Sequence, residues 1–357
     1  MASIGIAGAG LLGRLLAWRL TGAGHRVAVF DPAQGPAPRF DGHDAAAFTA
    51  AGMLSPVAEL ENASGGVARV GLRSIALWRQ IVAALPGRPF FAQRGSLLLA
   101  HRSDLGAAER VLARLRKAAE PGLVAEALEQ ERLRALEPAL CGIAHAWYLA
   151  GEAHLDAVGV MAALYEGALG ARWHFGAAVQ ELEPRRLRLA AGGWQRFDTV
   201  FDVRGVGARP DLPVRGVRGE TVWLHAPGLS LTRPLRLLHP RHRVYIVPRP
   251  GDVLILGASQ VESEDRSPVS LKTAVELMTA AHSVLPQLSE ARIVRLDRNL
   301  RPALPDHEPR TDIQDGLVRI NGLFRHGWLL APALADDALA TTKLAAAPEP
   351  RHESTPV

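Results

Sequence analysis

The sequence predicts a mixed α/β fold in which an α/β unit is divided along the chain by a β-rich block. Three observations lead to this prediction. The chain opens with a strand, a helix and a second strand; residues 217–258 are rich in strands; and a strand followed by a helix returns near the end. The 357 residues are enough for two domains or for one large α/β body.

The individual elements follow from hydrophobic periodicity and from the Gly and Pro residues that interrupt it. Strands are expected at 3–7, 25–30, 95–100, 199–203, 220–225, 243–247, 253–256 and 316–320, and β-structure at 172–183 and 185–189. Helices are expected at 11–21, 67–85, 105–117, 155–169, 271–282 and 333–344. Residues 32–44 read as a Pro/Gly-rich loop, 250–252 as the turn of a hairpin, and 347–357 as a disordered tail.

The composition is that of a globular protein rather than a disordered one, with 48% hydrophobic residues. Aromatic residues make up only 5%, which argues against a surface that stacks nucleic-acid bases. The net charge is +5, but the excess is arginine spread along the whole chain. We therefore interpret it as a solvated surface and expect neither a nucleic-acid nor a membrane partner.

The single cysteine, Cys141, cannot form an internal disulfide or a CxxC pair, so a reducing cytoplasm fits and a packed apolar role is expected. Residues 1–20 are rich in apolar residues, but four glycines and Arg14 interrupt the apolar run. No basic residue precedes this run, as one would in a signal peptide. A signal peptide is therefore not expected, and no apolar run reaches the length of about 18 residues that a membrane helix needs.

A glycine-rich turn joins the first strand to the first helix. Residues 8–13 read GxGxxG, where Gly8 allows the tight turn, Gly10 allows a pyrophosphate to approach, and Gly13 allows close packing of the helix. The free N–H groups of the helix N-terminus would face the phosphates. Asp31 stands at the end of the second strand, where an acidic residue binds a ribose hydroxyl. The motif does not separate FAD from NAD, although Asp31 argues against the 2′-phosphate of NADP.

Eight further segments follow in order: 50–56 (AAGMLSP), 94–98 (RGSLL), 151–156 (GEAHLD), 215–220 (RGVRGE), 245–249 (YIVPR), 257–268 (GASQVESEDRSP), 300–304 (LRPAL) and 321–327 (NGLFRHG). In this order and spacing the chain resembles the D-amino acid oxidase superfamily from about residue 3 to about residue 340. Within it, the chain resembles the glycine oxidase branch, which is associated with thiamine biosynthesis.

The resemblance implies FAD as cofactor and a Rossmann-like FAD-binding domain interleaved with a β-sheet-rich substrate-binding domain. Segments 1–85, 140–210 and 300–346 would form the first domain, and 86–139 and 211–299 the second. The implied FAD contacts are Gly8, Gly10, Leu11, Leu12, Gly13, Asp31, Ala51, Gly52, Met53, Val179, Leu323, Phe324, Arg325, His326, Gly327, Trp328 and Leu329. The last seven would aim backbone N–H groups at the flavin pyrimidine edge, where negative charge develops on reduction.

The resemblance also assigns the substrate contacts. Arg301 would bind the substrate carboxylate, for which its planar guanidinium is suited. Tyr245 would donate its phenol to the same carboxylate, and Arg325 would lie near flavin and substrate. Arg243 stands where some members of the family carry a histidine, and Gln260 where some carry a methionine, so we expect the pocket, to which Met53 also belongs, to be more polar than in those members.

The expected reaction is oxidation of a small amino acid, with dioxygen as electron acceptor, by a protein that the family suggests is a homo-oligomer. Open alternatives are an oxidase or dehydrogenase acting on sarcosine, another N-alkylglycine or a D-amino acid. A different class, a tRNA-modifying flavoenzyme, also stays open. Metal catalysis and serine hydrolysis are not expected, because the sequence has neither HExxH nor GxSxG.

Overall fold

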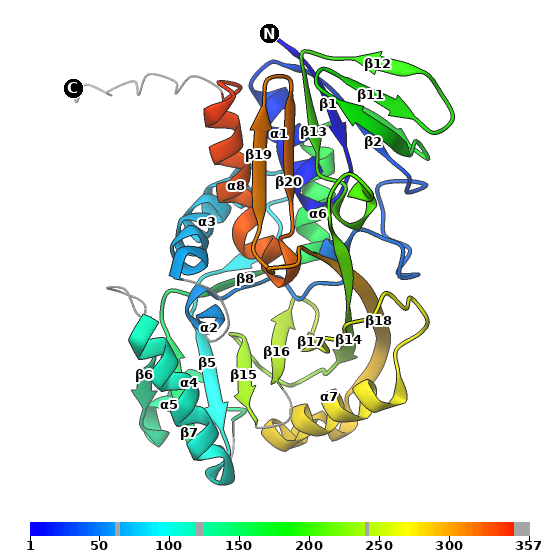
Figure 1. The fold of residues 1–357 in the computed structure, drawn as a ribbon. Helices are drawn as coiled ribbons and strands as arrows, with labels where there is room; N and C mark the ends of the chain where they lie inside the picture. Colours follow the sequence, from blue (N-terminus) through cyan, green and yellow to red (C-terminus); the bar gives the residue numbers. More distant parts are fainter. Residues whose placement is uncertain (61–64, 119–123, 141, 240–242, 346–357) are drawn as a thin grey trace, which may run out of the picture.

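The structure, a computed structural model, describes the chain except for residues 61–64, 119–123, 141, 240–242 and 346–357. The expectations for Cys141 and for the tail at 347–357 lie outside the described residues, as does the side chain of Arg243. The described helices and strands are built around two large sheets, one above the other in Figure 1.

A six-stranded sheet forms the upper part of the molecule in Figure 1, in the order β19-β20-β13-β1-β2-β9. All neighbours are parallel except β19, which pairs antiparallel with β20. The bounds are β1 (Ser3–Ala7), β2 (Arg26–Asp31), β9 (Arg172–Phe175), β13 (Thr199–Asp202), β19 (Arg310–Gln314) and β20 (Leu317–Asn321). Beside this sheet lies a three-stranded meander, β10 (Val179–Glu183), β11 (Arg186–Leu189) and β12 (Trp194–Arg196).

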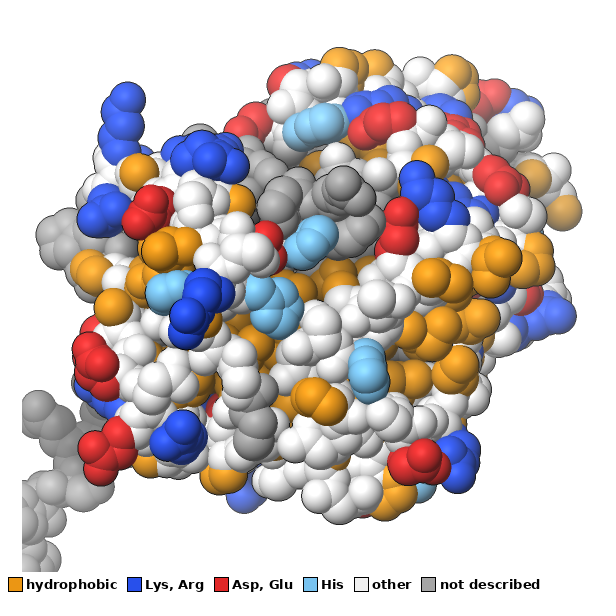
Figure 2. Space-filling model, turned by 90° about the horizontal axis from the view of Figure 1, so that it is seen from below, with side chains coloured by type: hydrophobic (Ala, Val, Ile, Leu, Met, Phe, Trp, Pro, Cys, Tyr) orange, Lys and Arg blue, Asp and Glu red, His pale blue; other side chains and the backbone are white. Residues whose placement is uncertain are grey.

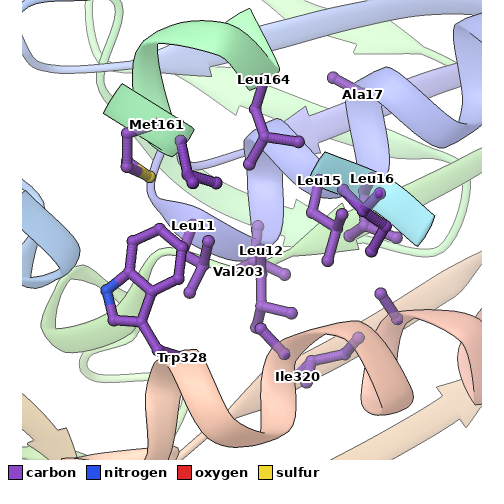
Figure 3. Close-up of a cluster of buried hydrophobic side chains, with 14 of the residues drawn as sticks. Leu11, Leu12, Leu15, Leu16, Ala17, Met161, Leu164, Val203, Ile320 and Trp328 are labelled. Carbon is purple, nitrogen blue, oxygen red and sulfur yellow. The ribbon is translucent and has the colours of Figure 1, made fainter. Parts of the chain in front are cut away.

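Four helices cover the six-stranded sheet: α1 (Leu11–Gly22), α3 (Gly65–Ala84), α6 (Ala157–Glu166) and α8 (Gly327–Thr341). Helix α1 contacts both α6 and α8. Figure 3 shows the cluster between them, where Leu15 and Leu16 are almost fully buried among Leu164, Ile320 and Trp328. Truncating a leucine packed this way typically costs about 2–5 kcal/mol, so this cluster holds α1 and α8 firmly in place.

An eight-stranded sheet forms the lower part, in the order β18-β14-β17-β16-β15-β5-β7-β6. Neighbours are antiparallel except β15 and β5, which are parallel. The bounds are β5 (Ser96–Ala100), β6 (Glu126–Leu128), β7 (His145–Leu149), β14 (Arg215–His225), β15 (Leu235–Leu238), β16 (Arg243–Arg249), β17 (Val253–Gly257) and β18 (Arg292–Ala303). Helices α4 (Leu105–Ala118), α5 (Gln130–Leu136) and α7 (Leu271–Val284) pack on it.

Short elements connect the two large sheets. A small sheet contains β3 (Met53–Leu54), β8 (Ala153–Leu155) and β4 (Phe91–Ala92), and α2 (Pro56–Glu59) follows β3 directly. The 3-10 helices are η1 (Ala46–Phe48), η2 (Arg102–Asp104), η3 (Gly205–Ala208), η4 (Pro286–Glu290) and η5 (Phe324–His326). No helix among the described residues is long and apolar enough to cross a membrane.

The mixed α/β architecture is confirmed, and most of the predicted elements lie within a few residues of their expected bounds. The β-structure expected at 172–183 is present as two strands, β9 and β10, and Gly176 between them takes a φ of +74°. Two predictions were wrong in part. The helix expected at 155–169 begins at Ala157, because Leu155 ends β8 and the Asp156 side chain caps the helix. The last helix begins at Gly327 rather than at residue 333.

The long strand β18 was not predicted, because charged residues interrupt its alternation of apolar side chains. The expected division of the chain into two discontinuous domains stays a prediction. On the face shown in Figure 2, Lys and Arg side chains are scattered among Asp and Glu around the rim. That face fits the interpretation of the excess arginine as a solvated surface.

Candidate functional site

A cavity of about 1100 Å³ lies between the two large sheets. Its upper wall consists of the segments that follow the carboxyl ends of β1, β2, β13 and β20. The chain runs from β1 to β2 on one side, whereas β13 pairs with β1 on the other, so the strand order reverses at β1. Ligands of open α/β sheets bind outside the carboxyl ends of the strands at this kind of reversal.

The glycine-rich turn forms one wall of the cavity. Gly8 has a φ of +108°, and a Cβ there would lie 2.7 Å from the Val203 carbonyl oxygen. Gly10, which precedes α1, lines the cavity together with Leu11 and Leu12. The free N–H groups of the first turn of α1 therefore face a space that can hold an anion.

Gly13 has a different place from the other predicted contacts. It does not line the cavity, and a Cβ there would lie 1.8 Å from the Gly8 carbonyl oxygen. Position 13 therefore requires a residue without a Cβ so that α1 can pack against the turn, as the sequence suggests.

Asp31 ends β2 and lines the same wall. Its Oδ2 accepts a hydrogen bond from the N–H of Ala9 at 2.6 Å, and its Oδ1 accepts one from Ala33 at 2.8 Å. A carboxylate can accept about four hydrogen bonds, so this one is held rigidly and can still receive a hydroxyl donor. Val179 also lines the cavity, and its carbonyl accepts a hydrogen bond from Arg204.

The loop before β3 brings bare backbone to the cavity. Ala51, Gly52 and Met53 all line it. Gly52 has a φ of +64°, and a Cβ there would lie 2.4 Å from the Leu155 carbonyl oxygen. Behind the loop, the buried guanidinium of Arg249 donates to the Ala51 carbonyl. Burial lowers the pKa of Arg249 to about 10, so it is a permanent cation beneath this loop at neutral pH.

Residues 323–329 also line the cavity, but as the 3-10 turn η5 and the first turn of α8 rather than as a loop. Pro332 lies inside α8 and has no N–H to donate to the carbonyl of Trp328. The indole N–H of Trp78 donates to that carbonyl instead, at 2.7 Å. The early start of α8 gives the cavity a second helix N-terminus, with free N–H groups that suit developing negative charge.

Arg301 and Tyr245 lie on the sheet wall of the cavity. Each covers a glycine: a Cβ at Gly219 would lie 2.3 Å from Arg301 Cζ, and one at Gly257 would lie 2.5 Å from the Tyr245 hydroxyl. Arg301 Nη1 donates to the carbonyl of Ser259 at 3.0 Å. The same nitrogen lies 3.4 Å from a second carbonyl, that of residue 218, and none of the described carboxylates forms an ion pair with the guanidinium.

Both side chains are half-buried, and their exposed parts line the cavity. Burial lowers the pKa of Arg301 and raises the pKa of Tyr245. Nearby arginines oppose the shift of Tyr245, with Arg301 the largest of them. The pair thus offers a cation and a protonated phenol to an anion in the cavity.

Sequence reasoning missed the partners of Arg325. Its Nη2 lies 3.1 Å from Oε2 of Glu59, the last residue of α2. Arg236 of β15 lies 3.5 Å from the same carboxylate, as does Nδ1 of His326. Burial would raise the pKa of Glu59, but Arg325, Arg236 and His326 together lower it to about 2. Burial lowers the pKa of His326, which is therefore neutral at neutral pH.

The sequence does contain a signal for Glu59 and Arg236, because each is a charged residue within an apolar stretch. Glu59 follows Pro56, Val57 and Ala58, and Arg236 stands between Leu235 and Leu237. A charged residue in such a stretch is buried at the cost of desolvation and therefore needs a partner.

Most residues predicted for the site are brought together by the structure. Those that line the cavity are Gly8, Gly10, Leu11, Leu12, Asp31, Ala51, Gly52, Met53, Val179, Tyr245, Gln260, Arg301, Leu323, Phe324, Arg325, His326, Gly327, Trp328 and Leu329. Gly13 packs behind it, and Arg243 contributes its backbone to β16. No group of side chains among the described residues could hold a metal ion.

A comparison with models of protein families decides the family. The model described as FAD dependent oxidoreductase, DAO, matches residues 3–340. The chain belongs to this family. Its cofactor is therefore FAD. The cavity fits this group, since it offers two helix N-termini, a glycine-rich turn and the carboxylate of Asp31, which could accept a ribose hydroxyl.

Similar proteins narrow the type. The chain is 37% identical to the thiamine biosynthesis oxidoreductase ThiO of Rhizobium etli, over 92% of this chain and 93% of that one. Glycine oxidase from Geobacillus kaustophilus shares the fold with a TM-score of 0.80 at 23% identity, over 98% of this chain and 99% of that one. Iminodiacetate oxidase from Chelativorans sp. BNC1 has a TM-score of 0.80 at 21% identity, over 99% and 98%. The protein is an FAD-dependent oxidoreductase of the type that includes ThiO and glycine oxidase.

Proposed function

We propose that this protein oxidises glycine or a closely related small amine to the imino acid, with dioxygen as electron acceptor. The imino acid hydrolyses to glyoxylate and ammonia, and dioxygen is reduced to hydrogen peroxide. The observation that carries the proposal is Arg301, which lies beside Tyr245 on the cavity wall and forms no ion pair with a described carboxylate.

In this proposal Arg301 and Tyr245 hold the substrate carboxylate. The guanidinium supplies a permanent charge, and the phenol supplies a donor that stays protonated because burial raises its pKa. Fixing the carboxylate at two points orients the α-carbon, and positioning of this kind accounts for a large part of enzymatic rate enhancement.

FAD supplies the acceptor for the hydride that leaves the α-carbon. The substrate reacts as the neutral amine, so no side chain needs to remove a proton from carbon. The N-terminal turn of α8 and the cation of Arg325 would stabilise negative charge on the bound flavin, and Gly52 and Met53 would form part of the wall around it.

A role in forming the thiazole of thiamine is proposed from the likeness to ThiO. A homo-oligomeric state and a cytoplasmic location stay predictions from the resemblance and the composition. An N-alkylglycine such as sarcosine is the second candidate, because the cavity extends past Gln260 to Lys272 and Thr273 of α7.

The test is anaerobic addition of glycine to the purified yellow protein. Bleaching of the flavin by glycine, followed by peroxide formation when oxygen is admitted, supports the proposal. Bleaching by sarcosine but not by glycine favours the second candidate. A flavin that no small amine bleaches contradicts both.

A further inference from the structure

Glu59 lies in the part of the cavity where the substrate carboxylate is proposed to bind, and the proposed reaction assigns no role to its own carboxylate. It ends the four-residue helix α2 and lines the cavity together with Arg301, Tyr245 and Arg325. The helix is anchored from behind, since the buried Glu152 accepts a hydrogen bond from the N–H of Ala58 at 2.9 Å. The position of Glu59 is therefore fixed by the fold.

The three arginines at this end of the cavity differ in their partners. Arg325 lies 3.1 Å and Arg236 lies 3.5 Å from Glu59, so these two cations share one carboxylate. The side chain of Glu59 is only 14% exposed and that of Arg236 only 8%, so water screens the group weakly. Arg301 donates to main-chain carbonyls and forms no ion pair with a described carboxylate.

We propose that Glu59 determines specificity by restricting the substrate to amines that carry a single carboxylate, because it occupies Arg325 and Arg236 and leaves Arg301 to bind that group. This inference rests on the proposed function. It names the substrate class as neutral-side-chain amino acids such as glycine and sarcosine, and it excludes amines with two carboxylates.

The physical reason is repulsion between like charges in a place with little water. A second carboxylate that reached Arg325 or Arg236 would lie against the carboxylate of Glu59, and the energy of such a pair is several times larger near a protein interior than in bulk water. Discrimination between ligands often depends on an element of this kind that rejects the wrong one. Replacing Glu59 by glutamine keeps the shape, removes the charge, and frees the two arginines to bind an anion.

The experiment uses the holoenzyme and anions that do not react. Acetate, malonate and succinate are titrated into the wild type and Glu59→Gln, and their dissociation constants are read from changes in the flavin spectrum. The wild type is expected to bind acetate more tightly than either dicarboxylate. In Glu59→Gln the preference should shift toward dicarboxylates by about tenfold or more, as removal of one close charge predicts.

Two further variants make the result specific. Glu126→Gln removes an ion-paired carboxylate that lies outside the cavity and should leave the preference unchanged. Glu59→Asp keeps the charge and should keep the wild-type preference; it also serves if Glu59→Gln does not retain FAD. The proposal is overturned if the wild type prefers a dicarboxylate, or if Glu59→Gln binds the anions with wild-type selectivity. An equal shift in Glu126→Gln also overturns it.

Bleaching by glycine tests the proposed function separately. A flavin that glycine leaves oxidised, in a protein that still prefers acetate, would contradict the proposed substrate and support the role of Glu59. If glycine bleaches the flavin but the protein shows no preference between acetate and the dicarboxylates, the proposed substrate is supported and the role of Glu59 is contradicted.

Discussion

Replacing Gly219 by alanine should damage substrate binding without a change in any residue that contacts the substrate. A Cβ at this position would lie 2.3 Å from Arg301 Cζ, whereas ordinary van der Waals contact begins at 3.4 Å. Because Gly219 lies within β14 and its backbone is paired on the sheet, the guanidinium has to move, by about 1 Å. A displacement of about 1 Å at a positioning group can lower the rate by roughly 100-fold.

The assay is steady-state oxidation of the best amine found for the wild type, with FAD content measured in parallel. We expect kcat/KM to fall by about 100-fold, mainly through KM, while FAD stays bound. Gly193→Ala is the matched control, since a Cβ there meets nothing within 4 Å. In an Arg301→Ala background, Gly219→Ala should add almost no further loss, because both changes act through one side chain. Additive losses, or a fully active Gly219→Ala, would refute the reasoning.

Three further substitutions test the surroundings of the site. Arg249→Met removes the donor to the Ala51 carbonyl, a loss typically worth about 1–3 kcal/mol, and should weaken FAD binding at least about tenfold in a fluorescence titration; an unchanged affinity would contradict the role given to Arg249. His154 is buried, and burial, followed by nearby arginines, lowers its pKa from 6.5 to about 3. His154 is protonated at a higher pH in the unfolded chain than in the folded protein, so the wild type loses stability as the pH falls from 6.5 toward 3. In urea unfolding at pH 5, His154→Leu should avoid about 2 kcal/mol of that loss. If the free energy of unfolding of the two proteins falls in parallel with pH, the role given to His154 is contradicted. Trp78→Phe deletes the donor to the Trp328 carbonyl and should cost about 1–3 kcal/mol of unfolding free energy; a smaller loss would mean that water replaces the indole.

Local sequence patterns predict the first half of the site well. The GxGxxG turn and Asp31 lie close together in the sequence, and each glycine answers a local steric need that the structure makes visible at Gly8 and Gly13. The strands β1, β2, β13 and β20 were predicted from short apolar runs, since parallel strands buried on both faces are largely apolar. The mostly exposed strand β19 of the same sheet was not predicted. Prediction was weaker where the tertiary structure overrides periodicity, as in β18 and at the start of α8.

The substrate half of the site could not be derived from spacing. Arg301 and Tyr245 come from strands far apart in the chain, and only the resemblance to a known family singled them out among many arginines. Glu59 and Arg236 were missed for the same reason, since they meet only when α2 packs beside β15. Two glycines are a better local sign than the charges. Gly219 lies within the buried strand β14 and Gly257 ends the buried strand β17, each at a position that a large side chain covers.

The ionisable groups of this site also predict the pH dependence of the proposed reaction. Glu59 has a pKa of about 2 and is ionised throughout the neutral range. Burial lowers the pKa of His326 from 6.5 and raises that of Tyr245 from 10.0, so between about pH 7 and pH 9 the first stays neutral and the second stays protonated.

None of these three groups changes charge in that window, so a rise of kcat/KM with pH there should reflect loss of the proton from the substrate's own ammonium group. Changing the substrate to an amine of lower pKa should move the rising limb by the same amount, as measured under oxygen-saturated conditions. A limb that stays at one pH for every substrate would assign the proton to a protein group and would contradict a mechanism that needs no side-chain base.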